Sequence, residues 1–295
     1  MSWVTLAPLS LMLALGTVLG RAPLPLHPSW SARLLATTCA TTAVAALGTG
    51  AVVSVNYAAT LAPAAAGRVP EWALFGDDSP VPHPVGLPAA LLTAAGLLAV
   101  ARTAAAWRAE LRGARAQMRE PLATDVPIAL AVPGRRGGVV LSRGMLRGFT
   151  AEELHVVLQH ETSHLRHRHH RYAASGALLR AVLPPLRPLS ERLRLAVERW
   201  ADEDAAEAVG DRALVARTIA KAALAHPPAP GPAGAFADSG VVQRVEALLG
   251  APPGRNTVTG PLLCMGNGFV TSSLTSVTLH LDHAAACVLP LLAAR

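Results

Sequence analysis

The feature that most constrains the fold is a long run of residues without a charged side chain, Leu34–Gly67. Two shorter uncharged stretches, Trp3–Gly20 and Gly86–Ala101, lie on either side of it. A helix needs ~20 mainly apolar residues to cross a bilayer, and 52% of the chain is apolar while only 15% is charged. We therefore predict three transmembrane helices within residues 1–107. The alternative, buried core helices of a soluble protein, explains an uncharged run of this length poorly.

The first stretch also resembles the apolar part of a signal peptide. No Lys or Arg precedes it, however, and no small-residue cleavage motif precedes Arg21, whereas a signal peptide has both features. We therefore predict that Trp3–Gly20 is a retained membrane helix.

The arginines around these stretches predict the orientation. The segment Arg21–Arg33 carries Arg and no acid, and five Arg lie between Arg102 and Arg119, whereas Pro63–Val85 carries one Arg against three acids. Positively charged loops stay in the cytoplasm. We expect a multi-pass protein of the cell membrane with its N-terminus outside and the segment after residue 107 in the cytoplasm.

The net charge of +7 raises the question of nucleic-acid binding. Nucleic-acid surfaces usually combine basic residues with aromatic side chains that stack on bases, and this chain has only four Phe and two Tyr. We expect the basic residues to contact the anionic headgroups of a lipid bilayer instead, with no direct nucleic-acid binding.

The motif that carries chemistry is His160-Glu161-Thr162-Ser163-His164, which has the form H-E-x-x-H. On a helix, His160 and His164 lie on one face and can bind one Zn²⁺. Glu161 lies one residue further round, where it can activate a water molecule as general base. The alternative, a pair of histidines in a core, does not explain Glu161.

The residues before the motif support a helix there. Thr150-Ala151-Glu152-Glu153 has the S/T-x-x-E form of a capping box. Ala129–Val132 and Gly138–Ser142 read as two short strands joined by a turn. An edge strand beside a zinc helix could hold an extended substrate, or the two strands could form a purely structural hairpin.

A second segment, Glu198-Arg199-Trp200-Ala201-Asp202, offers a third zinc ligand. A catalytic zinc site usually has three protein ligands and one water. Glu198 is the candidate ligand, and Asp202, on the same helix face, could accept a hydrogen bond from a ligand imidazole. The alternative is a solvated acidic face, because Glu203 and Asp204 follow.

The H-E-x-x-H motif followed by E-x-x-x-D resembles integral-membrane gluzincin peptidases. Two families share this pattern, the β-lactam-sensor and antirepressor family (BlaR/MecR type) and the heat-shock and CAAX-prenyl membrane proteases. The stretch Val139–Leu146 and the start of the following helix also resemble both families. The first family implies a cytoplasmic repressor of the BlaI/MecI type as substrate. This chain would be a short member of it that lacks a sensor domain.

The predicted fold is mainly α, with multi-pass membrane helices and a small zincin-like catalytic domain made of the H-E-x-x-H helix and a short β hairpin. Residues 108–250 form the cytoplasmic zinc metallopeptidase domain, within which 172–189 dips into the membrane or lies on it. Residues 251–295 form a linker and a candidate C-terminal transmembrane helix at 261–292. Within the catalytic domain, the sequence also predicts a loop at Pro227–Gly234 and a short helix at Val241–Leu249.

The predicted function is a membrane-bound zinc metalloendopeptidase that hydrolyses protein substrates. Glu161 and Asp202 are its predicted catalytic residues, with Arg212 as a candidate for oxyanion stabilisation. A quality-control or processing protease is one alternative, and a non-catalytic signalling protein that keeps the zinc fold is another. The histidines that follow the motif, His167, His169 and His170, are either extra metal ligands or part of a basic, solvated helix end. We favour the solvated helix end, because basic residues suit a helix C-terminus.

Overall fold

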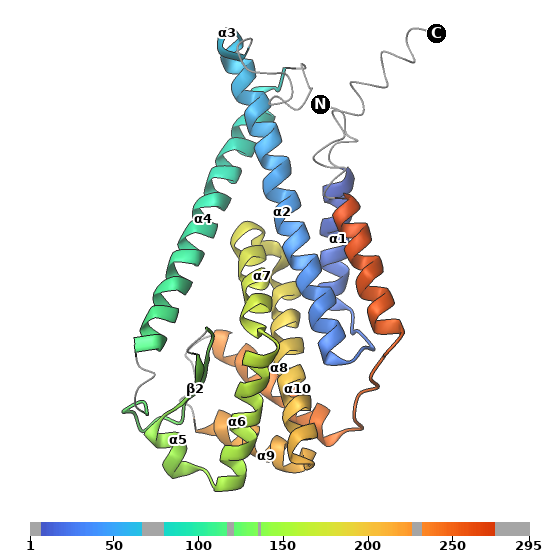
Figure 1. The fold of residues 1–295 in the computed structure, drawn as a ribbon. Helices are drawn as coiled ribbons and strands as arrows, with labels where there is room; N and C mark the ends of the chain where they lie inside the picture. The colour runs from blue at the N-terminus through green and yellow to red at the C-terminus, as the bar shows by residue number, and fades with distance from the viewer. Residues whose placement is uncertain (1–6, 67–79, 117–120, 135–136, 226–231, 275–295) are drawn as a thin grey trace.

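A computed structural model describes most of the chain and shows a mainly helical protein with one two-stranded sheet. The described residues are 7–66, 80–116, 121–134, 137–225 and 232–274. Figure 1 shows two levels. Long helices converge at one end of the molecule, and shorter helices and the sheet lie at the other.

The N-terminal part forms α1 (Ala7–Arg21), α2 (Pro28–Leu61), the short α3 (Pro63–Ala66) and α4 (His83–Ala116). Among the described residues, α2 and α4 are long and apolar enough to cross a membrane, by length and composition only. The described α1 has 15 residues, fewer than the ~20 of a full span. The beginning of the predicted helix Trp3–Gly20 lies outside the described residues.

Both long helices extend beyond the uncharged stretches that predicted them. α2 begins at Pro28 and therefore includes Arg33, whose guanidinium lies 4.4 Å from the ring centroid of Trp30 and 4.7 Å from that of Trp200. α4 continues beyond Ala101 through several arginines to Ala116. The expected boundary at residue 107, between the membrane region and the catalytic domain, therefore lies inside α4.

The predicted hairpin is present as β1 (Ala129–Val132) and β2 (Gly138–Leu141), which pair antiparallel with Ala129 opposite Leu141. The short α5 (Arg143–Gly148) follows and leads into the motif helix α6 (Ala151–Arg166).

The capping box that was predicted for the motif helix is confirmed. The backbone N–H of Glu153 donates to the Thr150 hydroxyl, and the backbone N–H of Thr150 donates to the Glu153 carboxylate. These two bonds satisfy N–H groups that have no partner within a helix. The cap therefore fixes where α6 begins, the helix that carries the H-E-x-x-H motif.

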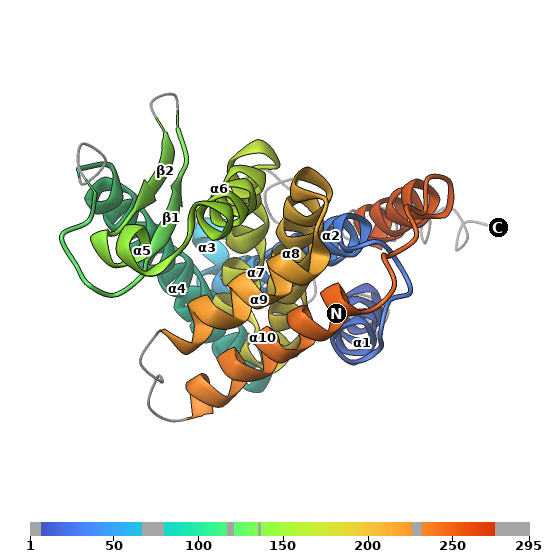
Figure 2. The same ribbon diagram turned by 90° about the horizontal axis from the view of Figure 1, so that it is seen from below.

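After α6 come α7 (His169–Val182), a 3₁₀ turn (Pro184–Leu186), α8 (Arg187–Val209), α9 (Arg212–Leu224) and α10 (Pro232–Leu249). The segment 172–189, predicted to dip into the membrane or lie on it, contains most of α7, the 3₁₀ turn and the start of α8. Both α7 and α8 pack on α2. α9 and α10 lie across the end of the molecule that is opposite α3, as the view from below shows (Figure 2).

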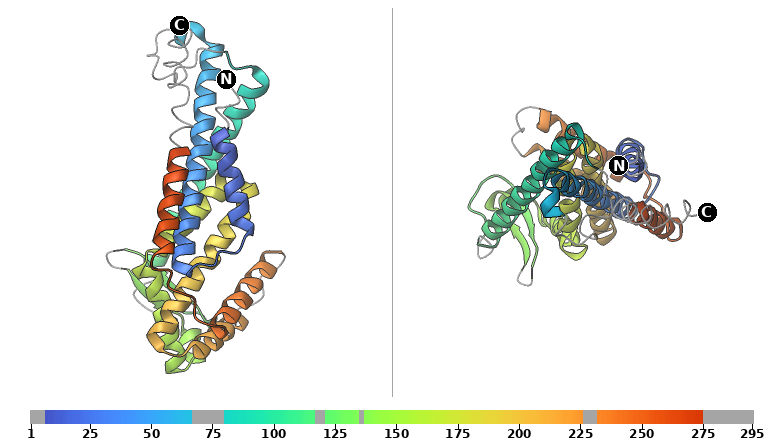
Figure 3. Two further views of the ribbon diagram at one scale, coloured as in Figure 1. Left: turned by 90° about the vertical axis from the view of Figure 1, so that its right-hand side faces the viewer. Right: turned by 90° about the horizontal axis from the view of Figure 1, so that it is seen from above.

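The C-terminal half contains one element that is longer than predicted. α10 begins at Pro232, so the predicted loop Pro227–Gly234 is wrong for its last three residues. Proline suits the first turn of a helix because its missing N–H has no partner there. The C-terminal helix is described over 259–274 and lies along α2 (Figure 3). Asn267 donates from its side-chain amide to the carbonyl of Leu34 on α2.

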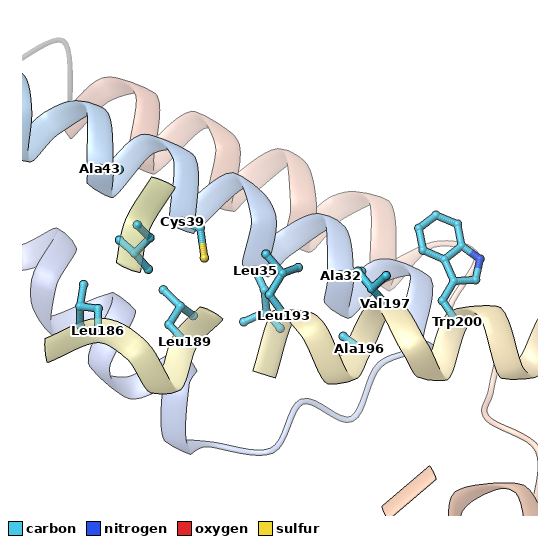
Figure 4. Close-up of a cluster of buried hydrophobic side chains, with 11 residues drawn as sticks. Ala32, Leu35, Cys39, Ala43, Leu186, Leu189, Leu193, Ala196, Val197 and Trp200 are labelled. Atoms are coloured by element: carbon cyan, nitrogen blue, oxygen red, sulfur yellow. The ribbon is translucent and has the colours of Figure 1, made fainter. Parts of the chain in front are cut away.

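The main core holds α8 against α2. Leu35 from α2 packs with Leu189, Leu193 and Trp200 from α8, and each is at most 4% exposed (Figure 4). Burial of each large apolar side chain contributes about 1.5–3 kcal/mol. Because Glu198 lies within this stretch of α8, the same packing fixes the position of the acidic residues that face α6.

Candidate metal centre

The structure brings the three predicted metal ligands together where α6 packs against α8. His160 and His164 project from α6, and Glu198 comes from α8. The Nε2 atoms of the two histidines lie 3.1 Å apart. One carboxylate oxygen of Glu198 is 3.6 Å from Nε2 of His160, and the other is 3.9 Å from Nε2 of His164. Three donor atoms therefore converge between the two helices.

This donor set fits zinc. Zinc holds nitrogen and oxygen ligands at ~2.0–2.2 Å in a tetrahedron, which places the ligand atoms about 3.3 Å from one another. The three observed separations lie on either side of this value. Two imidazoles and one carboxylate leave the fourth position open, as in catalytic zinc sites. Across the described ranges, this is the one group of His, Cys, Asp or Glu side chains close enough to hold a metal ion.

The far side of the His160 ring faces Asp202. Nδ1 of His160 lies 3.0 Å from Oδ1 of Asp202, whose side chain is 2% exposed. A carboxylate in this place favours the proton on Nδ1 and leaves Nε2 free to bind a metal. The structure thus places Asp202 behind a predicted ligand.

Arg244 is a site residue that the sequence reasoning missed. It lies on α10, and its Nε and Nη2 donate to the two carboxylate oxygens of Asp202, each at 2.7 Å. Its Nη1 lies 3.2 Å from Glu198. A planar guanidinium suits this paired recognition of a carboxylate. Arg244 therefore offsets the charge of two acidic residues and ties α10 to the site.

The charges of the site keep both acidic side chains ionised. Burial opposes a charge on Glu198, but the neighbouring His160 and the charge of Arg244 hold the pKa of Glu198 well below its usual range. Burial likewise opposes a charge on Asp202, and its hydrogen bond from Arg244 lowers its pKa. Two ionised carboxylates beside two imidazoles give the site a strong preference for a cation.

Glu161 lies beside the ligand cluster and outside it. Burial raises the pKa of Glu161, while the charge of His160 and a backbone hydrogen bond from Ala131 on β1 act in the opposite direction. A carboxylate with a raised pKa is a better proton acceptor. Its contact with Ala131 also shows that β1 faces the site.

Two cavities meet at this centre, and His160, Glu161 and Glu198 line both of them. The larger, of about 420 Å³, extends along α7, and its lining includes Arg180 and Arg194. The smaller, of about 290 Å³, extends toward α9, and most of its lining is apolar. β1 borders both cavities, so an extended chain lying along this strand would pass the metal centre.

The histidines after the motif do not form the solvated end that we favoured. His169 is 2% exposed. His167 contacts Asp204 at 2.8 Å and packs on Trp200, with ring centroids 4.4 Å apart. The helix breaks at Arg168 and folds these rings inward. None of the three belongs to the ligand group, so the extra-ligand alternative has no support either.

Arg212, the candidate for oxyanion stabilisation, lies elsewhere. Its guanidinium pairs with Glu203 and donates to the backbone carbonyls of Ala247 and Leu248 at the end of α10. This side chain joins α9, α8 and α10, and it lines neither of the two cavities beside the metal centre.

A model of peptidase family M48 matches residues 100–186 of the chain. This segment contains the end of α4, the β hairpin and the complete H-E-x-x-H helix, and it stops before Glu198. No curated protein and no solved structure matches the chain. The match supports a zincin-type metallopeptidase, while Glu198 depends on the geometry described above and the antirepressor relationship stays a prediction.

Proposed function

We propose that this chain is a membrane-bound zinc metalloendopeptidase that hydrolyses peptide bonds of protein substrates. The observation that carries the proposal is the convergence of His160, His164 and Glu198, with Glu161 beside them in a cavity. The match to a peptidase family over the motif helix supports the same activity.

His160, His164 and Glu198 would hold the zinc ion, with Asp202 and Arg244 keeping His160 and Glu198 in place. When bound, zinc polarises the scissile carbonyl and makes a water molecule more acidic. Glu161 accepts a proton from the attacking water and passes it to the leaving amine. Its burial supports the first step, because a raised pKa makes the carboxylate a better proton acceptor.

The substrate would lie in extended form along β1. Ala129, Leu130 and Ala131 on this strand line the larger cavity beside the metal centre. A strand edge supplies backbone donors and acceptors to an added strand, which gives affinity without sequence selectivity. Side chains on alternate faces would then enter the two cavities. A cytoplasmic repressor of the BlaI/MecI type is the substrate that the family resemblance suggests.

Membrane attachment rests on α2 and α4, which among the described residues are the two helices of sufficient length and apolar content. The arginine distribution supports a cytoplasmic position for the metal centre, because positively charged loops stay in the cytoplasm. Reporter tags inserted at residue 125 should give a cytoplasmic signal, and tags at residue 77 an external one. An external signal at residue 125 would remove cytoplasmic repressors from the substrates under consideration.

The metallopeptidase proposal is tested with purified full-length protein in proteoliposomes. We expect cleavage of labelled casein to stop on removal of metal with a chelator and to return on addition of about one equivalent of zinc. Cleavage that survives complete metal removal would contradict the proposal. Zinc binding without cleavage would favour the non-catalytic signalling alternative.

A further inference from the structure

The two imidazoles of the metal centre have different partners behind them. His160 has the carboxylate of Asp202 at Nδ1. His164 instead has another imidazole, since its Nδ1 lies 2.9 Å from Nδ1 of His169. The proposed metal-binding nitrogen of each ring, Nε2, points toward Glu198.

A break in the helix brings His169 to this position. Residues five apart do not share a face of a continuous helix. Here α6 ends at Arg166, and Arg168 adopts a left-handed conformation with φ 55° and ψ 45° before α7 begins. A non-glycine residue with positive φ is uncommon, and such strain is often found at functional sites. The turn at Arg168 folds His169 back beside His164.

The His169 ring is 2% exposed and packs among three other rings. Its centroid lies 4.8 Å from that of His164, 4.8 Å from that of Trp200 and 5.9 Å from that of Tyr172. Its Nε2 is buried and has no hydrogen-bond partner among the described residues. A ring that served packing alone would avoid this buried polar atom, because a phenyl ring of similar size carries none.

We infer that His169 is a positioning residue for the metal centre, whose Nδ1 accepts the Nδ1–H of His164 and holds that ring with Nε2 toward Glu198. This inference rests on the proposed role of His164 as a ligand. If Nε2 of His164 binds the metal, its proton must be on Nδ1. Only one proton fits between the two Nδ1 atoms, so His169 accepts the bond and carries its own proton on Nε2.

The consequence is an asymmetric pair of ligands. A carboxylate behind a ligand imidazole increases the negative charge that reaches the metal, whereas a neutral imidazole orients the ring without adding charge. His160 is thus supported by charge and by orientation, and His164 by orientation alone. Loss of the acceptor at residue 169 should therefore affect metal affinity while leaving the charge of the site unchanged.

The test compares zinc affinity, measured by competition with a chromophoric chelator, in the full-length protein and three variants. His169→Asn keeps an acceptor atom near the position of Nδ1, and His169→Phe keeps the ring but has no acceptor. His155→Phe makes the same exchange at an exposed histidine of α6 and is the control. We expect the Phe variant at residue 169 to bind zinc ~10–100-fold more weakly, the Asn variant to stay within a few-fold of wild type, and the control to match it.

Equal zinc affinity in His169→Phe and wild type would overturn the inference, as would equal losses in the Phe and Asn variants with matching falls in the melting temperature of the metal-free protein. If His169→Phe does not fold, ¹⁵N-histidine NMR of zinc-loaded wild type decides the question. His169 should carry its proton on Nε2, and a proton on Nδ1 would contradict the assignment. A wild-type protein that binds no zinc would remove the proposed function itself, a result distinct from zinc binding that does not depend on residue 169.

Discussion

The long helix α4 and the metal-site helices α6, α8 and α10 differ in the side chains that they expose, because α4 exposes apolar side chains and the metal site buries charged ones. On α4, Leu91 is 62% exposed and Leu92 is 73% exposed. At the metal centre, Asp202 is 1% exposed and Arg244 is paired with two carboxylates. The first region depends on overall apolar content, which many sequences satisfy. The second depends on pairs of particular atoms, so single substitutions there should have much larger effects.

The largest effect is expected for the three ligands. Because a zinc ion requires all its donors at once, His160→Ala, His164→Ala and Glu198→Ala should each lose nearly all bound zinc after dialysis. Metal content per chain is measured by mass spectrometry, with Leu92→Ala on α4 as the matched control. Full zinc retention in the Glu198 variant would remove this residue from the ligand set.

Arg244→Gln should be the next most severe change, because it leaves the buried Asp202 and the partly buried Glu198 without their cation. Breaking a buried ion pair on one side typically costs about 3–5 kcal/mol, and we expect a clear fall in melting temperature of the detergent-solubilised protein. Arg244→Lys should recover part of the loss. Unchanged stability in Arg244→Gln would show that α10 does not contribute to the centre as described.

The sequence was enough to predict the parts that depend on pattern. The capping box at Thr150, the strands β1 and β2 and the helical character of the uncharged stretches follow from local spacing, and the structure contains these elements within the residues that it describes. Arg244 and His169 could not be predicted in the same way. Arg244 lies 42 residues after its partner Asp202, so only the packing of α10 on α8 reveals the pair.

His169 was hidden for a different physical reason. Its neighbours in sequence are basic, which is typical of a solvated helix end, and nothing local indicates that Arg168 adopts a left-handed conformation. The length of α4 was also underestimated, because a charge-free window ends at the first arginine while the helix continues. Local sequence patterns therefore predict the helices, the strands and the H-E-x-x-H motif. The residues that support the metal ligands are revealed only by the contacts between helices.

One pair of leucine substitutions compares how much apolar contacts on α8 and on α4 contribute to the free energy of unfolding. Leu193→Ala on α8 removes a side chain that is 1% exposed in the core against α2, and such changes cost about 2–5 kcal/mol. Leu92→Ala on α4 should change the free energy of unfolding in detergent by less than ~0.5 kcal/mol. The two effects are compared by denaturant titration, and similar losses would show that α4 has a packed partner on that face.

The smallest effect is expected at the beginning of α6. Lys221 donates to Glu153 at 2.6 Å, and this hydrogen bond lowers the pKa of Glu153 from its ordinary value of 4.5. A lowered carboxylate pKa stabilises the fold above the unfolded pKa, and the contribution disappears as the pH falls through the folded pKa. Glu153→Gln should therefore cost about 0.2–1 kcal/mol at neutral pH and progressively less below about pH 4.5. Melting temperatures from pH 7 to pH 3 check this, and a gap that widens on acidification would contradict it.

The central claim is that the chain hydrolyses peptide bonds with zinc and Glu161. The most direct test measures casein cleavage and zinc content on the same proteoliposome samples of wild type and Glu161→Gln. Because Gln keeps the size of the side chain and cannot accept the proton, the variant should retain about one zinc per chain, as a three-ligand site does, and lose ~10²–10⁴-fold or more of the turnover. Cleavage by the variant at the wild-type rate would contradict the claim.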